Sequence, residues 1–360
     1  MSAIEIKSLG HSVYISSNFY ELSNRFFSDA KNNYSKFVVL LDENSSKHCL
    51  SPLLIEIDFL KDALFIEIES GEKNKSTATC ERIWEQLAHI KADRKTLFIN
   101  LGGGVISDLG GFAASTFKRG IDYINFPTTL LAQVDASVGG KVGIDLLNIK
   151  NAVGLFSTPK AVFIYPPFLR TLHSRQLLSG YAEMLKHALI NDLEQWNNLK
   201  NLKVGKLFSD AELAQQVRIK NQIICLDFHE KSLRKSLNFG HTVGHAIESY
   251  SLQNDKIPLL HGEALAIGII CESYLSKKIC GLDQKQFNDI IRYFLATFKK
   301  YKIKSKSFAT LLEFMRNDKK NEGNKMQLSL LSEIGKCEIN CVCNEEQLIE
   351  SLDYYRKLIE

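Results

Sequence analysis

Short apolar runs alternate with helical patterns through the first half of the chain. Three of these runs begin the segments 36–44, 64–76 and 96–108, and each segment ends in a polar or glycine-rich turn. A short apolar run before such a turn is typical of a buried strand, and helical patterns between strands indicate β-α-β units. The first half is therefore predicted to form a parallel sheet with helices packed against it.

Strand patterns fade beyond about Thr171, and long amphipathic patterns replace them. Apolar side chains recur at helical spacing in residues 174–190, 211–227, 241–250, 262–279 and 287–298. A chain of 360 residues is about right for two domains. We expect an α/β domain at residues 1–170 and an all-α domain at residues 171–360. Open α/β sheets bind ligands at the carboxyl ends of their strands, so we expect the active site in the cleft between the two halves.

The balance of charges narrows the class of partner. The 45 basic and 41 acidic residues give a formal net charge of +4, which is too even for a nucleic-acid-binding protein with one basic face. The first residues lack a basic segment followed by an apolar run, and no stretch approaches the roughly 18 apolar residues of a membrane span. We expect a cytoplasmic protein that binds neither nucleic acid nor a membrane.

The eight cysteines do not form the pattern of a disulfide framework. Five of them, Cys49, Cys80, Cys225, Cys271 and Cys280, stand singly in apolar surroundings, which predicts buried free thiols. The remaining three lie in the segment 337–343, where they alternate as in a strand and lack the C-x2-C spacing of a zinc site. Strand packing is the favoured interpretation of that segment.

Polar and glycine-rich turns follow three predicted strands and are candidates for binding a nucleotide. The turn 102–104 consists of three glycines before a helical pattern, where backbone N–H groups can approach a pyrophosphate. Ser107 stands where a G-x-G-x-x-G motif would require glycine, so a tight turn without a ligand stays open as an alternative. Asp42 ends the first of these strands, at the position of an acceptor for ribose hydroxyls. A carboxylate in a surface loop is an equally good interpretation for Asp42, and Glu72 and Lys75 taken alone fit a solvated turn.

The helical half contains polar residues with the spacing of a metal site. Glu183, Lys186 and His187 lie on one face of an otherwise apolar helix. His241 and His245 are four residues apart, the spacing at which two imidazoles of one helix can bind a zinc ion, and the segment 259–270 adds His261. Two histidines and a carboxylate with one open position are typical of catalytic zinc. Spacing alone does not say which histidines bind the metal.

Several cations lie beside glycines and beside these candidate ligands. Lys141 and Lys150 lie within the segment 134–154, which contains several glycines, and Lys220 and Arg234 precede the histidines. Each can be an ordinary surface residue. Together they suit a substrate with both a phosphate and a carboxylate, which arginine can contact with two hydrogen bonds and lysine as a point charge.

Six motifs together resemble the dehydroquinate synthase family. They are GGGVISDLGGF, RGIDYINFPTTLLAQVDASVGGK, IKNAVG, SGYAEMLKHALI, LNFGHTVGHAIE and HGEALAIGI, and the resemblance extends from about Asp42 to Asp318. It implies a nucleotide-binding α/β domain with a parallel sheet, followed by an all-α metal-binding domain. It also implies a homodimer.

The resemblance implies a role for individual residues at matching positions. Glu183, His241 and His261 would bind zinc or cobalt, whereas His245 would lie near the substrate phosphate. The positions implied for NAD are Asp42, Asn44, Glu72, Lys75, Gly102, Gly103, Gly104, Asp108, Thr128 and Thr129. The positions implied for substrate are Asp135, Lys141, Lys150, Asn151, Lys186, Lys220, Arg234 and Asn238. Arg119 would reach the phosphate site of a partner subunit, and Lys320 would lie near the substrate carboxylate.

The reaction that the resemblance implies accounts for this set of residues. The family converts 3-deoxy-arabino-heptulosonate 7-phosphate to 3-dehydroquinate and phosphate in the shikimate pathway. NAD oxidises a hydroxyl that zinc polarises, phosphate leaves by β-elimination, the hydride returns, and an aldol step closes the carbocycle. The chain departs from the family pattern at Val142, where threonine is common, at Tyr165, where aspartate is common, and at Ser107, where glycine is frequent. The alternatives are another sugar phosphate cyclase, a metal-dependent polyol dehydrogenase and a protein that only binds nucleotide.

Overall fold

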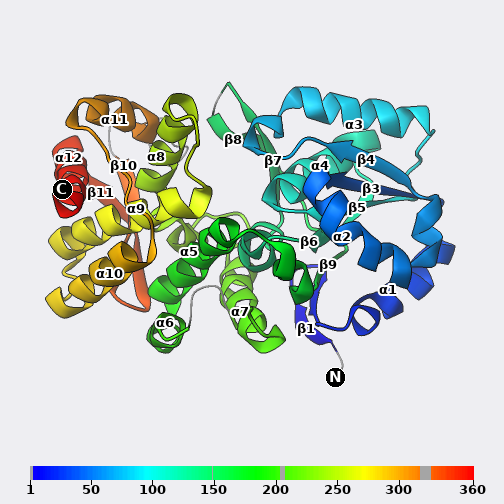
Figure 1. Cartoon of the computed structure of the whole chain (residues 1–360), viewed down its shortest axis with the longest axis horizontal. Helices are drawn as coiled ribbons and strands as arrows, with labels where there is room; N and C mark the ends of the chain where they lie inside the picture. Colours follow the sequence, from blue (N-terminus) through cyan, green and yellow to red (C-terminus); the bar gives the residue numbers. More distant parts are fainter. Residues whose placement is uncertain (1–2, 148, 203–206, 317–325) are drawn as a thin grey trace. The chain divides into compact units, whose positions relative to one another are not determined.

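The backbone divides into two compact units (Figure 1). The computed structural model describes residues 3–147, 149–202, 207–316 and 326–360. Unit 1 comprises Met1–Leu177 and Leu207–Cys225, and unit 2 comprises Leu178–Lys206 and Leu226–Glu360. The segment Leu207–Cys225 thus groups with the first unit, which the sequence pattern did not anticipate. The expected domain limits at residues 170 and 171 stay a prediction.

Unit 1 is built on a seven-stranded sheet. Its strands, in spatial order, are β1 (Ile4–Lys7), β2 (Ser12–Ile15), β9 (Ala161–Ile164), β6 (Asp122–Pro127), β5 (Thr96–Gly102), β3 (Lys36–Asp42) and β4 (Leu64–Ile68). All neighbours are parallel except β1 and β2, so the predicted parallel sheet is confirmed and carries one antiparallel edge strand. An antiparallel hairpin of β7 (Lys141–Leu146) and β8 (Ile149–Phe156) stands apart from this sheet.

Helices cover both faces of the sheet, because its central strands carry apolar side chains on both. The helices of unit 1 are α1 (Phe19–Asn33), α2 (Glu43–Glu56), α3 (Thr77–His89), α4 (Gly104–Thr116) and α7 (Asp210–Leu226). Val39 and Leu41 of β3 pack into a cluster with α1 and α2, whereas Val38 and Leu40 pack with α3 and α4. Successive side chains of β3 point to opposite faces of the sheet, so one apolar strand contributes side chains to both cores.

The adjacent strands β3 and β5 are followed by helices on opposite faces of the sheet. The chain leaves β3 into α2, which belongs to one core, and leaves β5 into α4, which belongs to the other. Such a reversal creates a crevice at the carboxyl ends of the two strands, where doubly wound sheets bind nucleotides. The turn after β5 is the predicted glycine turn, and the turn after β3 begins at Asp42.

Unit 2 is mainly helical. It contains most of α5 (Ser174–Asn191), together with α6 (Leu193–Lys200), α8 (His241–Asn254), α9 (His261–Leu275), α10 (Gln284–Thr297), α11 (Phe308–Arg316) and α12 (Glu345–Ile359). A hairpin of β10 (Met326–Glu333) and β11 (Lys336–Cys343) joins them, which confirms the strand expected for the cysteine segment. Among the described residues, no helix combines the length and apolar character needed to cross a membrane.

The cysteines are free thiols, as expected, but only four of the eight are buried, and one is exposed. Cys49, Cys80 and Cys271 are buried in the cores, and Cys280 is partly buried. Cys225 is exposed near the end of α7, so the expectation of a buried thiol was wrong there. Its helix presents this position to solvent, although its sequence neighbours Ile223 and Ile224 are buried.

Glycines set a very short distance between α8 and α9. A side chain at Gly268 of α9 would place its Cβ 1.9 Å from the carbonyl oxygen of Gly240 and 2.7 Å from the nitrogen of Gly244. Gly240 itself has a φ of +81°, which favours glycine, and precedes the first residue of α8. The two helices therefore pack backbone against backbone at the amino end of α8.

A second close contact brings the start of α9 against α5. A Cβ at Gly262 would lie 2.0 Å from the carbonyl oxygen of Ser179, and the Gly262 N–H donates to the Ser179 hydroxyl at 2.9 Å. These contacts fix the first turns of α8 and α9 beside α5. The residues at those positions, His241 and His261, are thereby held close to the middle of α5.

Replacing Gly268 by alanine tests the first of these contacts. In a helix interior, Gly→Ala usually stabilises by roughly 1 kcal/mol. Because the new Cβ would overlap the Gly240 backbone, Gly268→Ala should instead lower the free energy of unfolding by about 2–3 kcal/mol. Denaturant unfolding measures the difference, with Lys285→Ala on the exposed face of α10 as the reference for an exposed helical position. A gain in stability at residue 268 would contradict the packing described.

Candidate metal and nucleotide sites

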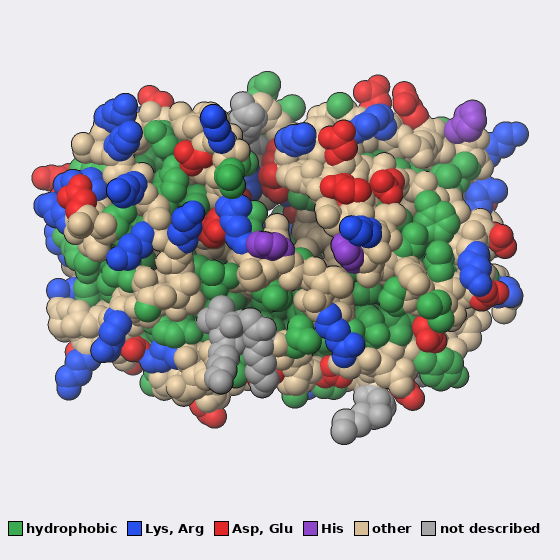
Figure 2. Space-filling model, viewed as in Figure 1, with side chains coloured by type: hydrophobic (Ala, Val, Ile, Leu, Met, Phe, Trp, Pro, Cys, Tyr) green, Lys and Arg blue, Asp and Glu red, His purple; other side chains and the backbone are tan. Residues whose placement is uncertain are grey.

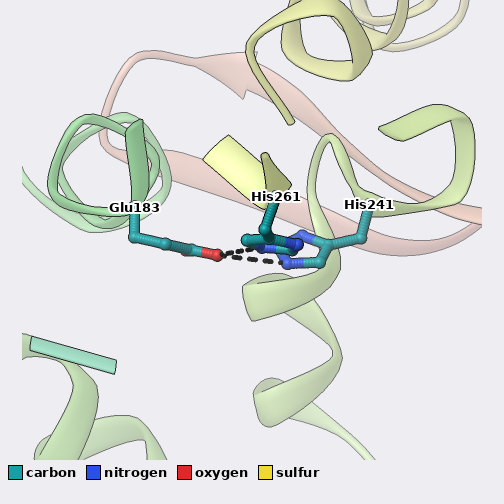
Figure 3. A group of neighbouring side chains, drawn as sticks. All are labelled: Glu183, His241 and His261. Atoms are coloured by element: carbon teal, nitrogen blue, oxygen red, sulfur yellow. Dashed lines mark hydrogen bonds and ion pairs between the residues drawn. The ribbon is translucent and has the colours of Figure 1, made fainter. Parts of the chain in front are cut away.

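Three side chains from three helices of unit 2 converge on one point (Figure 3). Glu183 comes from the middle of α5, and His241 and His261 are the first residues of α8 and α9. Glu183 Oε1 lies 2.9 Å from Nε2 of His261 and 3.4 Å from Nε2 of His241. The sequence-predicted carboxylate and two of the predicted histidines thus lie together.

These donors have the spacing of a tetrahedral metal site. Two ligand atoms that bind one zinc ion at about 2.05 Å in tetrahedral geometry lie about 3.3 Å apart. The separations from Glu183 Oε1 to the two Nε2 atoms, 2.9 and 3.4 Å, bracket that value, and all three donor atoms lie within 4.8 Å of one another. One carboxylate and two imidazoles suit zinc or cobalt and leave a coordination position open.

Charge in this group is arranged to keep the carboxylate ionised. Glu183 is 1% exposed, and its Oε2 lies 2.6 Å from Nζ of Lys186. Burial alone would raise its pKa, but Lys186 and the two histidines outweigh burial and hold the pKa of Glu183 well below its ordinary value. A buried negative charge is therefore available to a cation at this point.

The pKa values of His241 and His261 are shifted in opposite directions. Burial, followed by the nearby Lys186 cation, lowers the pKa of His241 to about 4. Burial also acts to lower the pKa of His261, but the carboxylates of Glu248 and Glu183 outweigh it and raise the pKa to about 10. Burial thus disfavours the charged form of His241, whereas the two carboxylates favour the charged form of His261.

A buried carboxylate that the sequence analysis missed anchors the start of α8. Glu272 of α9 is fully buried and accepts backbone N–H groups from Gly240 at 2.6 Å and Val243 at 3.1 Å. An anion is favourable at a helix amino terminus, and these two donors lie on either side of His241. The available signal was a glutamate inside the otherwise apolar run AIGIICESY.

The third histidine of the sequence prediction also lies in this region. The His245 ring centroid is 5.0 Å from that of His241 and 5.8 Å from that of His261. His245, Glu248 and His261 form a second group whose donor atoms lie within 4.8 Å of one another. Geometry therefore brings all three histidines together, and two alternative ligand sets share His261.

Arg234 is fixed by a loop that a single carboxylate organises. Asp227 accepts hydrogen bonds from the backbone N–H groups of Lys231, Ser232 and Arg234 at 2.7–3.1 Å. The Arg234 side chain is 2% exposed and donates to the Phe228 carbonyl at 2.6 Å. Asp227 was not singled out from the sequence, although it ends the helical pattern of residues 211–227.

Asn238 belongs to the same segment of unit 2. It ends the short helix η6 (Leu233–Asn238), which leads directly into α8. Its side-chain amide donates to Glu230 Oε1 at 2.6 Å, and Glu230 has a φ of +58°. Two of the predicted substrate residues are therefore held by one loop, which connects to the first residue of α8.

In unit 1, the predicted nucleotide residues lie at the carboxyl ends of β3 and β5. Asp42 caps α2 by accepting the Ser45 N–H at 2.7 Å, and Asn44 follows in the first turn of α2. A Cβ at Gly102 would lie 2.4 Å from the Ile106 side chain, and one at Gly103 would lie 3.0 Å from Thr129. The turn thus requires small residues whether or not it binds a ligand.

The remaining nucleotide residues form or adjoin this edge of the sheet. Gly103 is the N-cap of α4, and Gly104 is its first residue. The Thr128 N–H donates to the Gly102 carbonyl at 2.9 Å, and Thr129 Oγ1 accepts the Ala132 N–H at 3.2 Å. The threonines therefore hold the turn after β6 against the glycine turn after β5.

A buried lysine links a residue predicted to bind NAD with a residue predicted to bind substrate. Lys75, 3% exposed, donates to Asp108 Oδ2 at 2.6 Å and to Asn151 Oδ1 at 2.5 Å. Beside it, Lys150 Nζ lies 3.2 Å from Glu72 Oε1. The β7–β8 hairpin is thus tied through Lys150 and Asn151 to the turn after β4 and to α4.

Lys220 and Asp135 also meet within unit 1. Lys220 Nζ lies 2.8 Å from Asp135 Oδ1 and donates to the Asp135 carbonyl at 2.6 Å. Lys141, the first residue of β7, is exposed. Lys320 lies outside the described residues. On the face drawn in Figure 2, lysines and arginines are interspersed with acidic residues, so positive charge of functional interest is local.

Arg119 stands in an unusual backbone conformation. Lys118 and Arg119 have φ angles of +49° and +67°, a region that side chains other than glycine seldom adopt. The exposed Arg119 and Lys160 line a pocket of about 380 Å³, which Ser115 and Ser157 also line. Strain of this kind is retained where a side chain must be presented in a defined direction.

The departures from the family pattern lie in packed positions. Val142 is 7% exposed in the core beside α4, where a Cβ at Gly111 would lie 2.5 Å from its Cγ1. Tyr165 packs edge-on against Phe19 and Phe168 with ring centroids 5.0 Å apart. Ser107 is buried and donates to the Gly103 carbonyl. All three side chains therefore serve packing within unit 1.

Two family models match most of the chain. Residues 65–179 match the model described as 3-dehydroquinate synthase N-terminal, and residues 180–321 match 3-dehydroquinate synthase C-terminal. The 3-dehydroquinate synthase of Parabacteroides distasonis is 42% identical over 327 residues, covering 90% of this chain and 92% of that protein. The 3-dehydroquinate synthase of Clostridium acetobutylicum is 39% identical over 324 residues, covering 86% and 88%.

Solved structures share the fold at lower identity. A 2-deoxy-scyllo-inosose synthase, solved with carbaglucose-6-phosphate, NAD+ and Co2+, gives a TM-score of 0.82 at 22% identity over 99% of both chains. A 2-epi-5-epi-valiolone synthase from Streptomyces hygroscopicus, solved with NAD+ and Zn2+, gives 0.79 at 22% identity over 98% of both. These likenesses confirm the fold class, an α/β unit with a parallel sheet and a helical unit.

The Asp227 loop gives a pH-dependent prediction. Burial raises the pKa of a carboxyl group, but the three backbone donors outweigh it and lower the pKa of Asp227. A carboxyl group whose pKa is lower in the folded protein stabilises the fold at pH values above its pKa in the unfolded chain, about 3.9. That stabilisation is lost as the pH falls through the pKa of the folded protein. Asp227→Asn should therefore lower the free energy of unfolding by about 1 kcal/mol at pH 7. The loss should be smaller at pH values below about 3.9.

Denaturant unfolding of both proteins across this pH range measures the difference. Glu67→Gln, at an exposed position of β4, serves as the control and should show no such trend. A stability difference that grows toward acid pH would contradict the role of Asp227 in the loop.

Proposed function

The chain belongs to the 3-dehydroquinate synthase family, and on that premise we propose that it converts 3-deoxy-arabino-heptulosonate 7-phosphate to 3-dehydroquinate and phosphate. The reaction is a phosphate-eliminating, carbon–oxygen lyase step of the shikimate pathway. The observation that carries the proposal is the convergence of Glu183, His241 and His261 in a chain of this family. The fold alone does not select the substrate, because cyclases that make other carbocycles share it.

We assign Glu183, His241 and His261 to zinc or cobalt, and the carboxyl ends of β3 and β5 to NAD. When bound, the metal polarises a substrate hydroxyl and NAD accepts and later returns a hydride. NAD+ with Zn2+ or Co2+ in the structural neighbours supports these assignments. The separations among the three donors and the ionised state of Glu183 support the metal site.

The chain's own residues bind and orient an anionic substrate. Lys186 lies beside Glu183 and supplies a positive charge next to the metal ligands. Arg234, buried and held through the Asp227 loop, suits the two-point recognition of a phosphate or carboxylate. Orientation is a large part of catalysis in a reaction where several steps use one bound molecule.

The other predicted substrate residues keep their assignment as proposals. In unit 1 they are Asp135, Lys141, Lys150, Asn151 and Lys220, and in unit 2 they are Asn238 and His245. Lys220 is oriented by the backbone carbonyl oxygen and Oδ1 of Asp135, and Lys150 and Asn151 are anchored by Glu72 and Lys75. Such anchored cations meet a substrate without first ordering long side chains.

Arg119 supports a homodimer as part of the proposal. It is exposed, and it follows α4 in a segment where Lys118 and Arg119 both have positive φ. An arginine fixed in this way suits contact with the phosphate of a substrate bound to a second subunit. We also propose a cytoplasmic location, in keeping with a biosynthetic role.

Phosphate release is the direct test of the reaction. Purified protein with NAD and zinc should release phosphate from 3-deoxy-arabino-heptulosonate 7-phosphate with no net NADH absorbance and with 3-dehydroquinate as product. Removal of the metal by a chelator should abolish release, and zinc or cobalt should restore it. Net NADH formation would point to a dehydrogenase, and absence of phosphate release to a different cyclase.

The two histidines of α8 provide a matched test of the ligand set. His241→Ala should weaken zinc binding by more than the roughly 10–100-fold that loss of an outer hydrogen-bond partner costs. His245→Ala should keep one zinc per chain and lose activity, because we assign it to substrate. Metal analysis after dialysis distinguishes them. Zinc lost from His245→Ala but kept in His241→Ala would favour the alternative set of His245, Glu248 and His261.

A further inference from the structure

The imidazole of His261 lies between two carboxylates that approach different ring nitrogens. Its Nε2 is 2.9 Å from Glu183 Oε1, and its Nδ1 is 3.2 Å from Glu248 Oε2. Glu183 belongs to the proposed ligand set, whereas Glu248 has no role in the proposed reaction. Glu248 is 5% exposed, so its placement beside His261 is part of the packed interior of unit 2.

His241 shows the same arrangement with a different acceptor. Its Nδ1 is 3.2 Å from the Phe239 carbonyl oxygen, which can only accept, so Nδ1 carries the hydrogen. A neutral imidazole with its hydrogen on Nδ1 has its lone pair on Nε2, and His241 Nε2 is the atom that faces Glu183. A backbone carbonyl thus selects the tautomer of His241 that can bind a metal.

A carboxylate is likewise only an acceptor when ionised, so Glu248 selects the same tautomer in His261. Its negative charge adds to the hydrogen bond, because a buried imidazole that donates to a carboxylate becomes a stronger electron donor at its other nitrogen. The ring is also held against rotation. Both effects act on Nε2, the atom that converges with Glu183 and His241.

Glu248 reaches His261 because of where it stands on α8. It lies seven residues after His241, which is two helical turns along the same face, and α8 packs closely against α9. One helix thereby supplies a proposed ligand at its first residue and the partner of another ligand at its eighth. The contact between α8 and α9 keeps both in register.

We propose that Glu248 is a positioning residue of the metal site, which holds His261 with Nε2 directed at the ion and strengthens it as a ligand. This inference rests on the proposed function, because it needs a metal at Glu183, His241 and His261. Glu248 does not contact the ion.

The competing role for Glu248 is direct binding of an ion together with His245 and His261. The existing hydrogen bond between Glu248 and His261 favours positioning, because an ion at Nδ1 would break it. An ion at each nitrogen of His261 would also require the ring to lose both protons. The test therefore includes the number of ions bound as well as their affinity.

The experiment compares zinc affinity in Glu248→Ala, Glu248→Gln and the unaltered protein. Competition between metal-free protein and a chromogenic chelator gives the dissociation constant for zinc without any assay of activity. We expect Glu248→Ala to bind zinc roughly 10–100-fold more weakly. Glu248→Gln should lose less, because its amide oxygen still accepts from Nδ1 but carries no charge.

Asp289→Asn is the matched control. Asp289 is a partly buried carboxylate of unit 2 that accepts the indole N–H of Trp196 at 2.8 Å and pairs with Lys200. Its replacement should lower the thermal midpoint and leave zinc affinity unchanged. The absorption spectrum of cobalt-substituted protein gives a second readout, which should shift in the Glu248 variants and stay constant in Asp289→Asn.

The outcomes distinguish failure of the proposed metal site from failure of the proposed role of Glu248. If the unaltered protein binds no zinc, the proposed metal site fails, and the role of Glu248 fails with it. If it binds one zinc and folded Glu248→Ala binds equally well, only the role of Glu248 is overturned. Two zinc ions per chain, with one lost in Glu248→Ala, would make Glu248 a ligand instead.

Discussion

The carbonyl oxygen of Gly240 occupies the space that a side chain at residue 268 would need, and this contact sets the separation of α8 and α9. Glu272 reinforces it by accepting N–H groups from the start of α8. The same helix α9 is held against α5 by Gly262. The convergence of Glu183, His241 and His261 depends on these backbone contacts, since the three side chains come from three different helices. A shift of any one of these helices would change the donor-atom separations on which metal coordination depends.

Much of the fold could be predicted because it follows from local patterns. Continuous apolar runs indicated buried strands such as β3 and β5, and alternation indicated the strand that carries Cys337. The segment Leu207–Cys225 was harder, because its amphipathic pattern shows that it is a helix but not which core receives its apolar face. The spacing of apolar residues does not show which core a helix packs against.

Some residues of the candidate site could likewise be predicted from the sequence, and others could not. Motifs pointed to Glu183, His241 and His261, whose proximity the structure shows. No role was assigned to Glu272, to Asp227 or to Glu248, which is the last residue of the motif LNFGHTVGHAIE, because these carboxylates act on residues that are distant in sequence or on backbone N–H groups. A buried glutamate in an apolar helix was the one visible signal, and its partner could be identified only in three dimensions. Likewise, Lys75 and Asn151 were assigned to different ligands, although they share a hydrogen bond.

Lys141 and Val142 are neighbours in the sequence, yet the pleat of β7 directs one to solvent and the other into the core beside Gly111. Selection therefore acts on them separately. Position 141 is constrained by charge, whereas position 142 is constrained by volume and by the cost of burying a hydroxyl without a partner. Valine meets that second requirement more simply than threonine. A change of side chain at residue 142 thus alters a packing contact beside Gly111 while leaving the charge one residue away unchanged.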